Sequence, residues 1–410
     1  MYANEGTVAV VLPEQTRDHH KSQPDDSDSK LEGAEEVLSE YPDGGQRAWL
    51  VVLGVWCALF PTFGIMNITG ILEEWLAEDQ LQGHSKASIS WIFSIYNFLF
   101  WLGGIQFILS FSILGGLSSS AVLTPTLGTI NHWFLKRRGL ATGVATTSGG
   151  IGGIVWSAIF GALQDNLGFP WIVRILGFMS IGCFAVSLLL METRLPPNKS
   201  AGGTIDIRSL REVRFTIASI AVSFAEVGLM IMITYLPAYA ASHGVTGALS
   251  YNLMSIFSAT LIFGRVIPGL LADRWGRYNV MTVTGGVSML LVLALWMKAG
   301  EDTAAIVTFA AFYGFWSSPA VGLSPVCIAQ ISRTEDYGKR YGTTTAIFGL
   351  SILVAIPVAG EILKAQNPAS GQETNYTGLI VFCGASYAFS TVLLVVTKVI
   401  SVGWSVTRVF

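Results

Sequence analysis

The chain has 410 residues, of which 51% are hydrophobic and 12% are charged, and its mean hydropathy is +0.55. Soluble domains carry about 25% charged residues, so this composition excludes an ordinary soluble protein and indicates helices that face lipid. The net charge of -3 offers no basic excess for nucleic acid, and the four cysteines lie far apart in apolar runs. We therefore expect no nucleic-acid partner, no metal site and no cofactor.

Residues 1–45 are rich in Asp, Glu, Ser and Pro and almost lack aromatic residues. Such a segment buries too little apolar surface to fold, so we predict a disordered cytosolic tail. Because the chain opens with this polar tail, we expect no cleaved secretory peptide. The apolar run that follows, up to Leu72, exceeds the roughly 20 residues that cross a bilayer and predicts the first transmembrane helix.

A basic triplet, Lys136, Arg137 and Arg138, separates two long uncharged runs. Short basic loops stay on the cytosolic side of membranes, so this loop is expected in the cytosol. Gly139 and Gly143 follow at the four-residue spacing of seams where membrane helices pack closely.

The stretch from Ser88 to Trp133 contains no Asp, Glu, Lys or Arg. Its length suits two helices, yet an odd number of crossings must follow the first helix to return Lys136 to the cytosol. We therefore hypothesise that the chain lacks one helix and its preceding basic loop, with the join between Gly104 and Gln106. The alternative is two tilted helices and a re-entrant segment.

The remaining apolar runs complete the predicted architecture. Two spans follow the basic triplet, a cytosolic linker occupies 193–214, and a cytosolic tail follows at 401–410. Bases gather in the loops that this arrangement places inside the cell. The sequence thus predicts an all-α polytopic membrane protein of about 11 transmembrane helices, with an incomplete bundle of about five over 46–192 and a six-helix bundle over 215–400. Its six spans are expected near 215–240, 248–271, 279–297, 303–331, 341–363 and 376–398.

An internal repeat supports two related halves, as in many transporters. The run from Lys136 to Gly139 (KRRG) has a counterpart from Lys339 to Gly342 (KRYG). The second half also carries Asp273-Arg274-Trp275-Gly276-Arg277 after its second helix.

These segments resemble the major facilitator superfamily and, within it, the monocarboxylate porter family of fungal type. Asp43-Gly44-Gly45 leading to Trp49 resembles that family's signature before the first helix, and Trp133 to Gly143 resembles its second signature. Asp273 to Arg277 resembles the superfamily's loop between the second and third helices of each half.

The resemblance implies two bundles that rock about a central site, carrying a small monocarboxylate-like organic anion, in many members together with protons. The expected partners are therefore this anion, protons and the lipid bilayer. We expect a plasma-membrane protein, with the vacuolar membrane as the alternative, and both termini in the cytosol. No phosphate-binding loop or catalytic constellation indicates an enzyme. The competing hypothesis is that the chain is a non-transporting sensor or an inactive, truncated transporter.

Charged residues within spans are costly and therefore candidate functional groups. Arg265 matches the helix-eight arginine with which family members bind a substrate carboxylate; the alternative is that it snorkels or pairs with a neighbouring acid. Glu226, near the middle of its helix, is a candidate for proton exchange or a counter-ion of Arg265. Animal members carry a lysine where this chain has Asn67 and an aspartate where it has Leu261. Asn67 is expected to form hydrogen bonds in the wall of the substrate site; the alternative is a role in helix packing.

Two further groups complete the candidates. Asp273, Arg274 and Arg277 are expected to gate the transporter by binding the opposite bundle in one state; the alternative is that they only set topology. The basic residues Lys136, Arg137 and Arg138 are candidates for the same gating role. Additional residues expected to line the cavity are Tyr96, Asn97 and Ser317.

Overall fold

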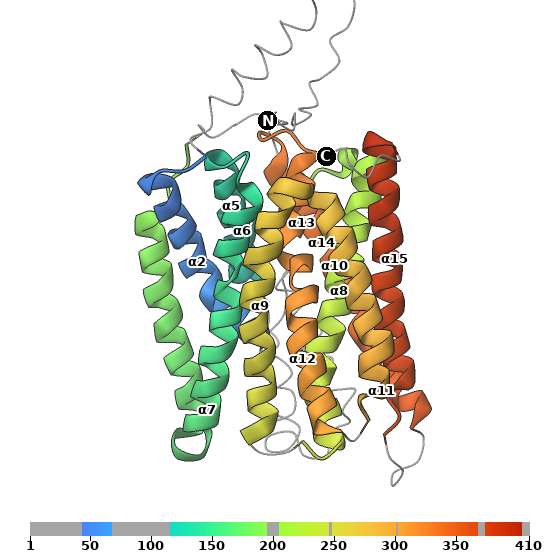
Figure 1. Ribbon diagram of the computed structural model, residues 1–410. Helices are drawn as coiled ribbons and strands as arrows, with labels where there is room; N and C mark the ends of the chain where they lie inside the picture. The colour runs from blue at the N-terminus through green and yellow to red at the C-terminus, as the bar shows by residue number, and fades with distance from the viewer. Residues whose placement is uncertain are drawn as a thin grey trace, which may run out of the picture.

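The computed structural model describes residues 43–67, 115–194, 205–245, 248–300, 302–367 and 374–403. Within these ranges the regular structure is entirely helical, and the long helices run side by side (Figure 1). The first half contains α2 (Gln46–Asn67), α5 (Gly115–Trp133), α6 (Arg138–Thr146) and α7 (Ser148–Leu190). A short linker helix, η2 (Ile207–Arg211), precedes the second half.

The second half forms six consecutive crossings. They are α8 (Val213–Ser242), α9 (Ala248–Trp275), α10 with η3 and α11 (Arg277–Leu290, Leu291–Trp296, Met297–Ala299), α12 with α13 (Thr303–Ser317, Pro319–Gln330), α14 (Tyr337–Gln366) and α15 (Thr377–Val402). These bounds lie close to the six predicted spans.

Seven helical stretches in the described part of the chain are long and apolar enough to cross a membrane. One is α2 and the other six make up the second half. The prediction of an all-α polytopic membrane protein is confirmed. The proposed join between Gly104 and Gln106 lies outside the described residues, so the absence of one helix stays a prediction.

Element α7 is longer than one membrane crossing and folds back on itself. Gly64 of α2 lies against Gly152 near the start of α7, and Gly54 of α2 lies against Leu190 at its end. Gly54 and Gly64 are about 15 Å apart along α2 at 1.5 Å per residue, so both ends of α7 pack along one short helix. Figure 1 shows the resulting pair of antiparallel arms.

Asp43 fixes the start of α2 to the end of α5. Its backbone N–H donates to the carbonyl oxygen of Trp133 at 3.1 Å. Its carboxylate accepts the backbone N–H groups of Leu135 and Lys136 at 2.8 Å and of Arg137 at 3.3 Å. The start of α2 and the end of α5 therefore lie at the same end of the molecule. We call it the basic end, since it carries Lys136, Arg137, Arg138, Arg277, Lys339 and Arg340.

Glycines of α6 bring the first half into main-chain contact with α9. A Cβ atom on Gly139 would lie 2.6 Å from the carbonyl oxygen of Gly269, and one on Gly143 would overlap the carbonyl oxygen of Arg265. Only glycine permits helices to approach this closely. We call this contact the glycine seam; it confirms the predicted small-residue packing at Gly139 and Gly143.

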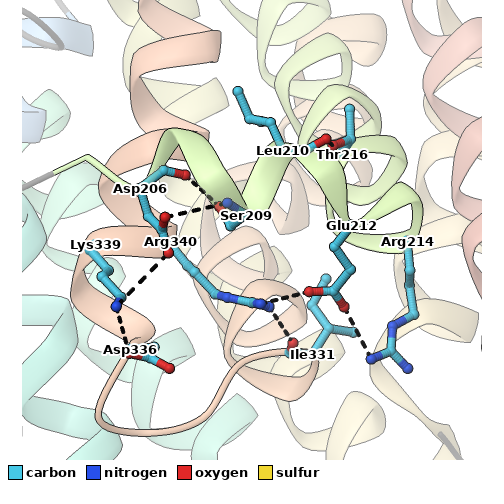
Figure 2. Close-up of polar contacts among 10 residues, drawn as sticks. All are labelled: Asp206, Ser209, Leu210, Glu212, Arg214, Thr216, Ile331, Asp336, Lys339 and Arg340. Carbon is cyan, nitrogen blue, oxygen red and sulfur yellow. Dashed lines mark hydrogen bonds and ion pairs between the residues drawn. The ribbon is translucent and has the colours of Figure 1, made fainter. Parts of the chain in front are cut away.

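The described end of the linker is bound to the second half (Figure 2). Arg340 of α14 donates to the carboxylate of Glu212 at 2.6 Å and to the carbonyl oxygen of Ile331 at 2.9 Å. The backbone N–H of Asp206 donates to the hydroxyl of Thr343 at 2.8 Å. These contacts make η2 part of the second bundle's basic end.

Candidate functional site

Arg265 lies in α9 at the contact between the two halves. Its side chain is only 2% exposed, and Nη1 donates to the carbonyl oxygen of Thr146 at the end of α6. The guanidinium carbon lies 5.5 Å from the centre of the Phe63 ring in α2, within cation–π range. Nε and Nη2 have no hydrogen-bond partner among the described residues. Two nitrogens of this buried guanidinium are therefore unsatisfied by the described residues.

Glu226 of α8 is the acidic residue that faces this guanidinium. It is 5% exposed and interacts electrostatically with Arg265. Because Nε and Nη2 of Arg265 lack partners among the described residues, Glu226 acts on Arg265 as a nearby charge and not as a hydrogen-bond partner of these two nitrogens. The role of Glu226, in proton exchange or as a counter-ion of Arg265, stays a prediction.

Asn67, the last residue of α2, meets Arg265 at Gly149. Its Nδ2 donates to the carbonyl oxygen of Gly149 at 2.7 Å, and its side chain is 1% exposed. A Cβ atom on Gly149 would lie 2.8 Å from Nη1 of Arg265 and 2.9 Å from Cβ of Phe63. The structure therefore brings two of the predicted substrate residues, from different halves, to one glycine of α7.

Ser317 lies in a different environment. Its hydroxyl donates to the carbonyl oxygen of Tyr313, one turn earlier in α12, at 2.6 Å. Tyr313 in turn shares a hydrogen bond of 2.7 Å with the hydroxyl of Tyr387 in α15. The contacts of Ser317 are thus within the second bundle, and a role in the substrate site stays a prediction. Tyr96 and Asn97 lie outside the described residues.

Asp273 and Arg277 connect the second half to the first at the basic end. The carboxylate oxygens of Asp273 accept the backbone N–H groups of Gly139 and Leu140, each at 2.9 Å. These N–H groups belong to the first turn of α6, where unpaired donors and the helix dipole favour an anion. Arg277 donates to the carbonyl oxygen of Leu135 at 2.9 Å. We call this set of contacts the basic-end latch.

The other predicted gating residues differ from one another. Arg138 is buried, and its guanidinium donates to the carbonyl oxygens of Phe134 and Asn131, so it stabilises the turn between α5 and α6. Lys136 and Arg137 have exposed side chains and contribute their backbone N–H groups to Asp43. Arg274 is exposed as well, and its gating role stays a prediction.

The sequence did not predict the positions of two further side chains. The hydroxyl of Ser258 in α9 lies against Gly153 of α7, and the carboxylate of Asp43 binds the loop after α5. Asp43 stands out in the sequence only as part of a signature, because its partners at Leu135 to Arg137 are more than ninety residues away. Ser258 carries no charge, so its residue type alone does not indicate a functional role. Its position about two helical turns before Arg265, on the same face of α9, is the signal that identifies it.

The family profile of the major facilitator superfamily matches residues 87–356 and, in a second match, residues 253–404. The chain belongs to the major facilitator superfamily. The members of this superfamily similar to the chain are transporters, which confirms that the chain is not an enzyme and that it is an integral membrane protein with a small-molecule substrate.

Two fungal superfamily members illustrate the similarity. The riboflavin transporter MCH5 of Saccharomyces cerevisiae is 30% identical, with 93% of this chain and 84% of the relative covered. The aspyridones efflux protein apdF of Emericella nidulans is 29% identical, with 88% and 80% covered. The alignment with the yeast protein extends over 442 positions although this chain has 410 residues. That relative therefore contains residues without a counterpart here.

Solved superfamily structures share the fold. The human organic anion transporter MFSD10 superimposes with a TM-score of 0.63 at 12% identity, covering 86% of this chain and all of that one (100%). The Escherichia coli fucose:proton symporter FucP gives a TM-score of 0.55 at 14% identity, with 86% and 97% covered. At these identities the likeness concerns the arrangement of helices alone.

Proposed function

We propose that the chain is a secondary active transporter that moves a small organic anion by alternating access, with Arg265 as the anion-binding residue. The observation that carries this proposal is the pair of unpartnered guanidinium nitrogens on a buried side chain. An arginine at the centre of a membrane helix costs about 2.5–3.5 kcal/mol on insertion scales. A carboxylate that accepts from both nitrogens offsets this cost, because a guanidinium binds carboxylates through two parallel hydrogen bonds.

The relatives support transport of an organic solute. One is named for riboflavin and another for the efflux of aspyridones. The signatures around Asp43 and between Trp133 and Gly143 further favour the monocarboxylate porter family. These two names suggest that the site admits solutes larger than a three-carbon acid.

Glu226 is the proposed proton carrier. When its carboxylate is ionised, its negative charge interacts with the positive charge of Arg265 and competes with the substrate anion for that interaction. When a proton binds, that competition ends and Arg265 is available to the anion. Binding of a proton and an anion would then favour each other, which is the coupling that a symporter needs.

The basic-end latch and the glycine seam are the proposed gate. Both join the two halves at the basic end, so the described conformation is closed there. Opening to the basic side would require Asp273 to release the first turn of α6. With the basic residues in the cytosol, this is an outward-facing or occluded state of a plasma-membrane protein, or of a vacuolar one, with both termini in the cytosol.

Uptake by the reconstituted full-length chain tests the proposal. We expect Arg265→Gln to lower the uptake of radiolabelled mandelate and phenylacetate by about tenfold or more, because hydrogen bonds to charged groups contribute about 1.5–3 kcal/mol. Arg174→Gln is the matched control, since Arg174 is exposed and lies 5.0 Å from the ring centre of Trp171. Equal uptake by the Arg265 variant would overturn the proposal.

A second candidate is an inactive or sensing relative. It is favoured by the 442-position alignment with a protein that has residues absent here, in agreement with the hypothesis of a missing helix. Sequencing the transcript across codons 100–110 tests the join itself. A correctly inserted protein that moves no organic anion, with or without a pH gradient, would favour this candidate.

A further inference from the structure

The orientation of the Asn67 amide leaves one hydrogen-bond acceptor without a partner. Nδ2 must face the carbonyl oxygen of Gly149, to which it donates at 2.7 Å, because the reverse orientation would place two acceptors together. Oδ1 is then directed elsewhere, and it has no partner among the described residues although the side chain is 1% exposed. Most buried polar atoms in proteins are hydrogen-bonded, so this oxygen requires an explanation.

Ser258 presents a second unpartnered group beside it. Its hydroxyl is without a hydrogen-bond partner in the described part of the chain, and its side chain is 1% exposed. It lies on α9 about two turns before Arg265 and therefore on the same face. A Cβ atom on Gly153 would overlap the Ser258 hydroxyl and would lie 3.4 Å from Cβ of Asn67. Ser258 and Asn67 thus meet at Gly153, one turn along α7 from Gly149, where Asn67 meets Arg265.

The unpartnered atoms at this contact include both hydrogen-bond donors and hydrogen-bond acceptors. Arg265 offers donors only, Asn67 Oδ1 is an acceptor only, and a serine hydroxyl can serve as either. A simple carboxylate would satisfy Arg265 but would leave Asn67 Oδ1 unpaired. A ligand that completes the whole set must carry a negative group and, next to it, a hydrogen-bond donor.

We infer that Asn67 and Ser258 form a neutral subsite beside Arg265, and that this subsite selects organic anions bearing a hydroxyl or another hydrogen-bond donor. The inference rests on the proposed function and specifies its substrate class. A site built to bind a hydroxyl discriminates against the analogue without it, because the protein's own polar groups then remain unpaired. Arg265 binds the negative group of the substrate, and the subsite determines which anions are preferred.

Matched pairs of anions test this subsite in liposomes containing the full-length chain. Each pair differs by hydroxyl groups: mandelate with phenylacetate, glycolate with acetate, and gluconate with hexanoate. We expect wild-type protein to take up the hydroxylated member of at least one pair about tenfold faster. Asn67→Leu and Ser258→Ala should each reduce that preference several-fold, measured as the ratio of the uptake rates of the two members of the pair.

Ser386→Ala is the matched serine control, since the Ser386 hydroxyl already donates to the carbonyl oxygen of Phe382 in its own helix. It should retain the wild-type preference. Ser258→Ala also protects the test against misfolding of the Asn67 variant, because removing a hydroxyl that has no partner in the described structure changes the packing least.

The outcomes separate the inference from the function on which it rests. Uptake that requires Arg265 but shows no preference for hydroxylated anions, or a preference that survives in both variants, would overturn the inference and leave the proposed function standing. If Arg265→Gln transports as well as wild type, or if no anion of the panel is taken up, the proposed function fails and the inference fails with it.

Discussion

Asp43 and Arg277 bind the same residue, Leu135, from opposite halves of the molecule. The carboxylate of Asp43 accepts the N–H of Leu135 at 2.8 Å, and the guanidinium of Arg277 donates to its carbonyl oxygen at 2.9 Å. Asp43 belongs to the first half and Arg277 begins α10 in the second. The loop after α5 is thus positioned by one half and bound by the other, so damage to either contact should affect the gate.

Asp43→Ala should lower both stability and transport. The substitution removes three backbone hydrogen bonds to a carboxylate, so we expect a loss of about 2 kcal/mol in unfolding free energy, measured by thermal unfolding in detergent. Asp302→Ala is the control, because Asp302 caps α12 by accepting the N–H of Ala304 at 2.9 Å. The control should lose stability but retain uptake; if Asp43→Ala also retains uptake, Leu135 is not part of the gate.

Gly143→Ala should weaken the closed state at the basic end. The added methyl would overlap the carbonyl oxygen of Arg265, and such overpacking costs about 1–3 kcal/mol. The measurement is maleimide labelling of a cysteine introduced at Leu140, with the four native cysteines replaced; we expect labelling to rise about fivefold or more. Gly177→Ala should leave labelling unchanged, since nothing lies within 4 Å of a Cβ at Gly177. Equal labelling in both variants would contradict a role for the glycine seam in closure.

Glu226→Gln should remove the dependence of uptake on external pH. In wild-type protein we expect uptake to increase as the external solution is acidified, because a proton on Glu226 removes the charge that competes for Arg265. The glutamine variant mimics the protonated form and should transport at a rate that changes little with pH, measured across a pH series in liposomes. A variant with the wild-type pH profile would assign the proton to another group.

Glu212 and Arg340 should show measurable energetic coupling. Their side chains are 34% and 18% exposed and lie 2.6 Å apart, and Figure 2 shows Arg340 also directed at the carbonyl oxygen of Ile331. A double-mutant cycle with Glu212→Gln and Arg340→Gln should give about 1 kcal/mol of coupling in thermal unfolding. The exposed pair Glu361 and Lys364, at 3.7 Å, should give a coupling near zero.

The helices of the second half were predictable because each apolar run ends in charged or turn-forming residues. Arg265 and Glu226 were predictable as functional candidates for a related reason: a charge within an apolar run stands out in the sequence. The rotation of each helix was not predictable. Ser317, expected at the cavity, donates to Tyr313 in its own helix, whereas Ser258, which was not selected, lies beside Asn67.

Contacts between distant segments were equally hidden in the sequence. The glycine spacing at Gly139 and Gly143 indicated a close helix contact but not its partner, which is the backbone of α9 at Gly269 and Arg265. The signature containing Asp43 marked a resemblance but not a hydrogen-bonding role. These contacts depend on how helices that are far apart in the chain pack against one another, and a single sequence does not reveal that packing.

Because the seam at Gly143 is made of main-chain atoms, it contains nothing that can gain or lose a proton and no ion pair that salt can screen. Among the described residues, acidity and ionic strength can therefore influence the conformational equilibrium through the ionisable groups around the seam, such as Asp43, Asp273 with Arg277, and Glu226 with Arg265. The stability of the contact at Gly143 should depend on temperature and on the thickness of the surrounding membrane, but should not depend directly on the pH or salt concentration of the buffer.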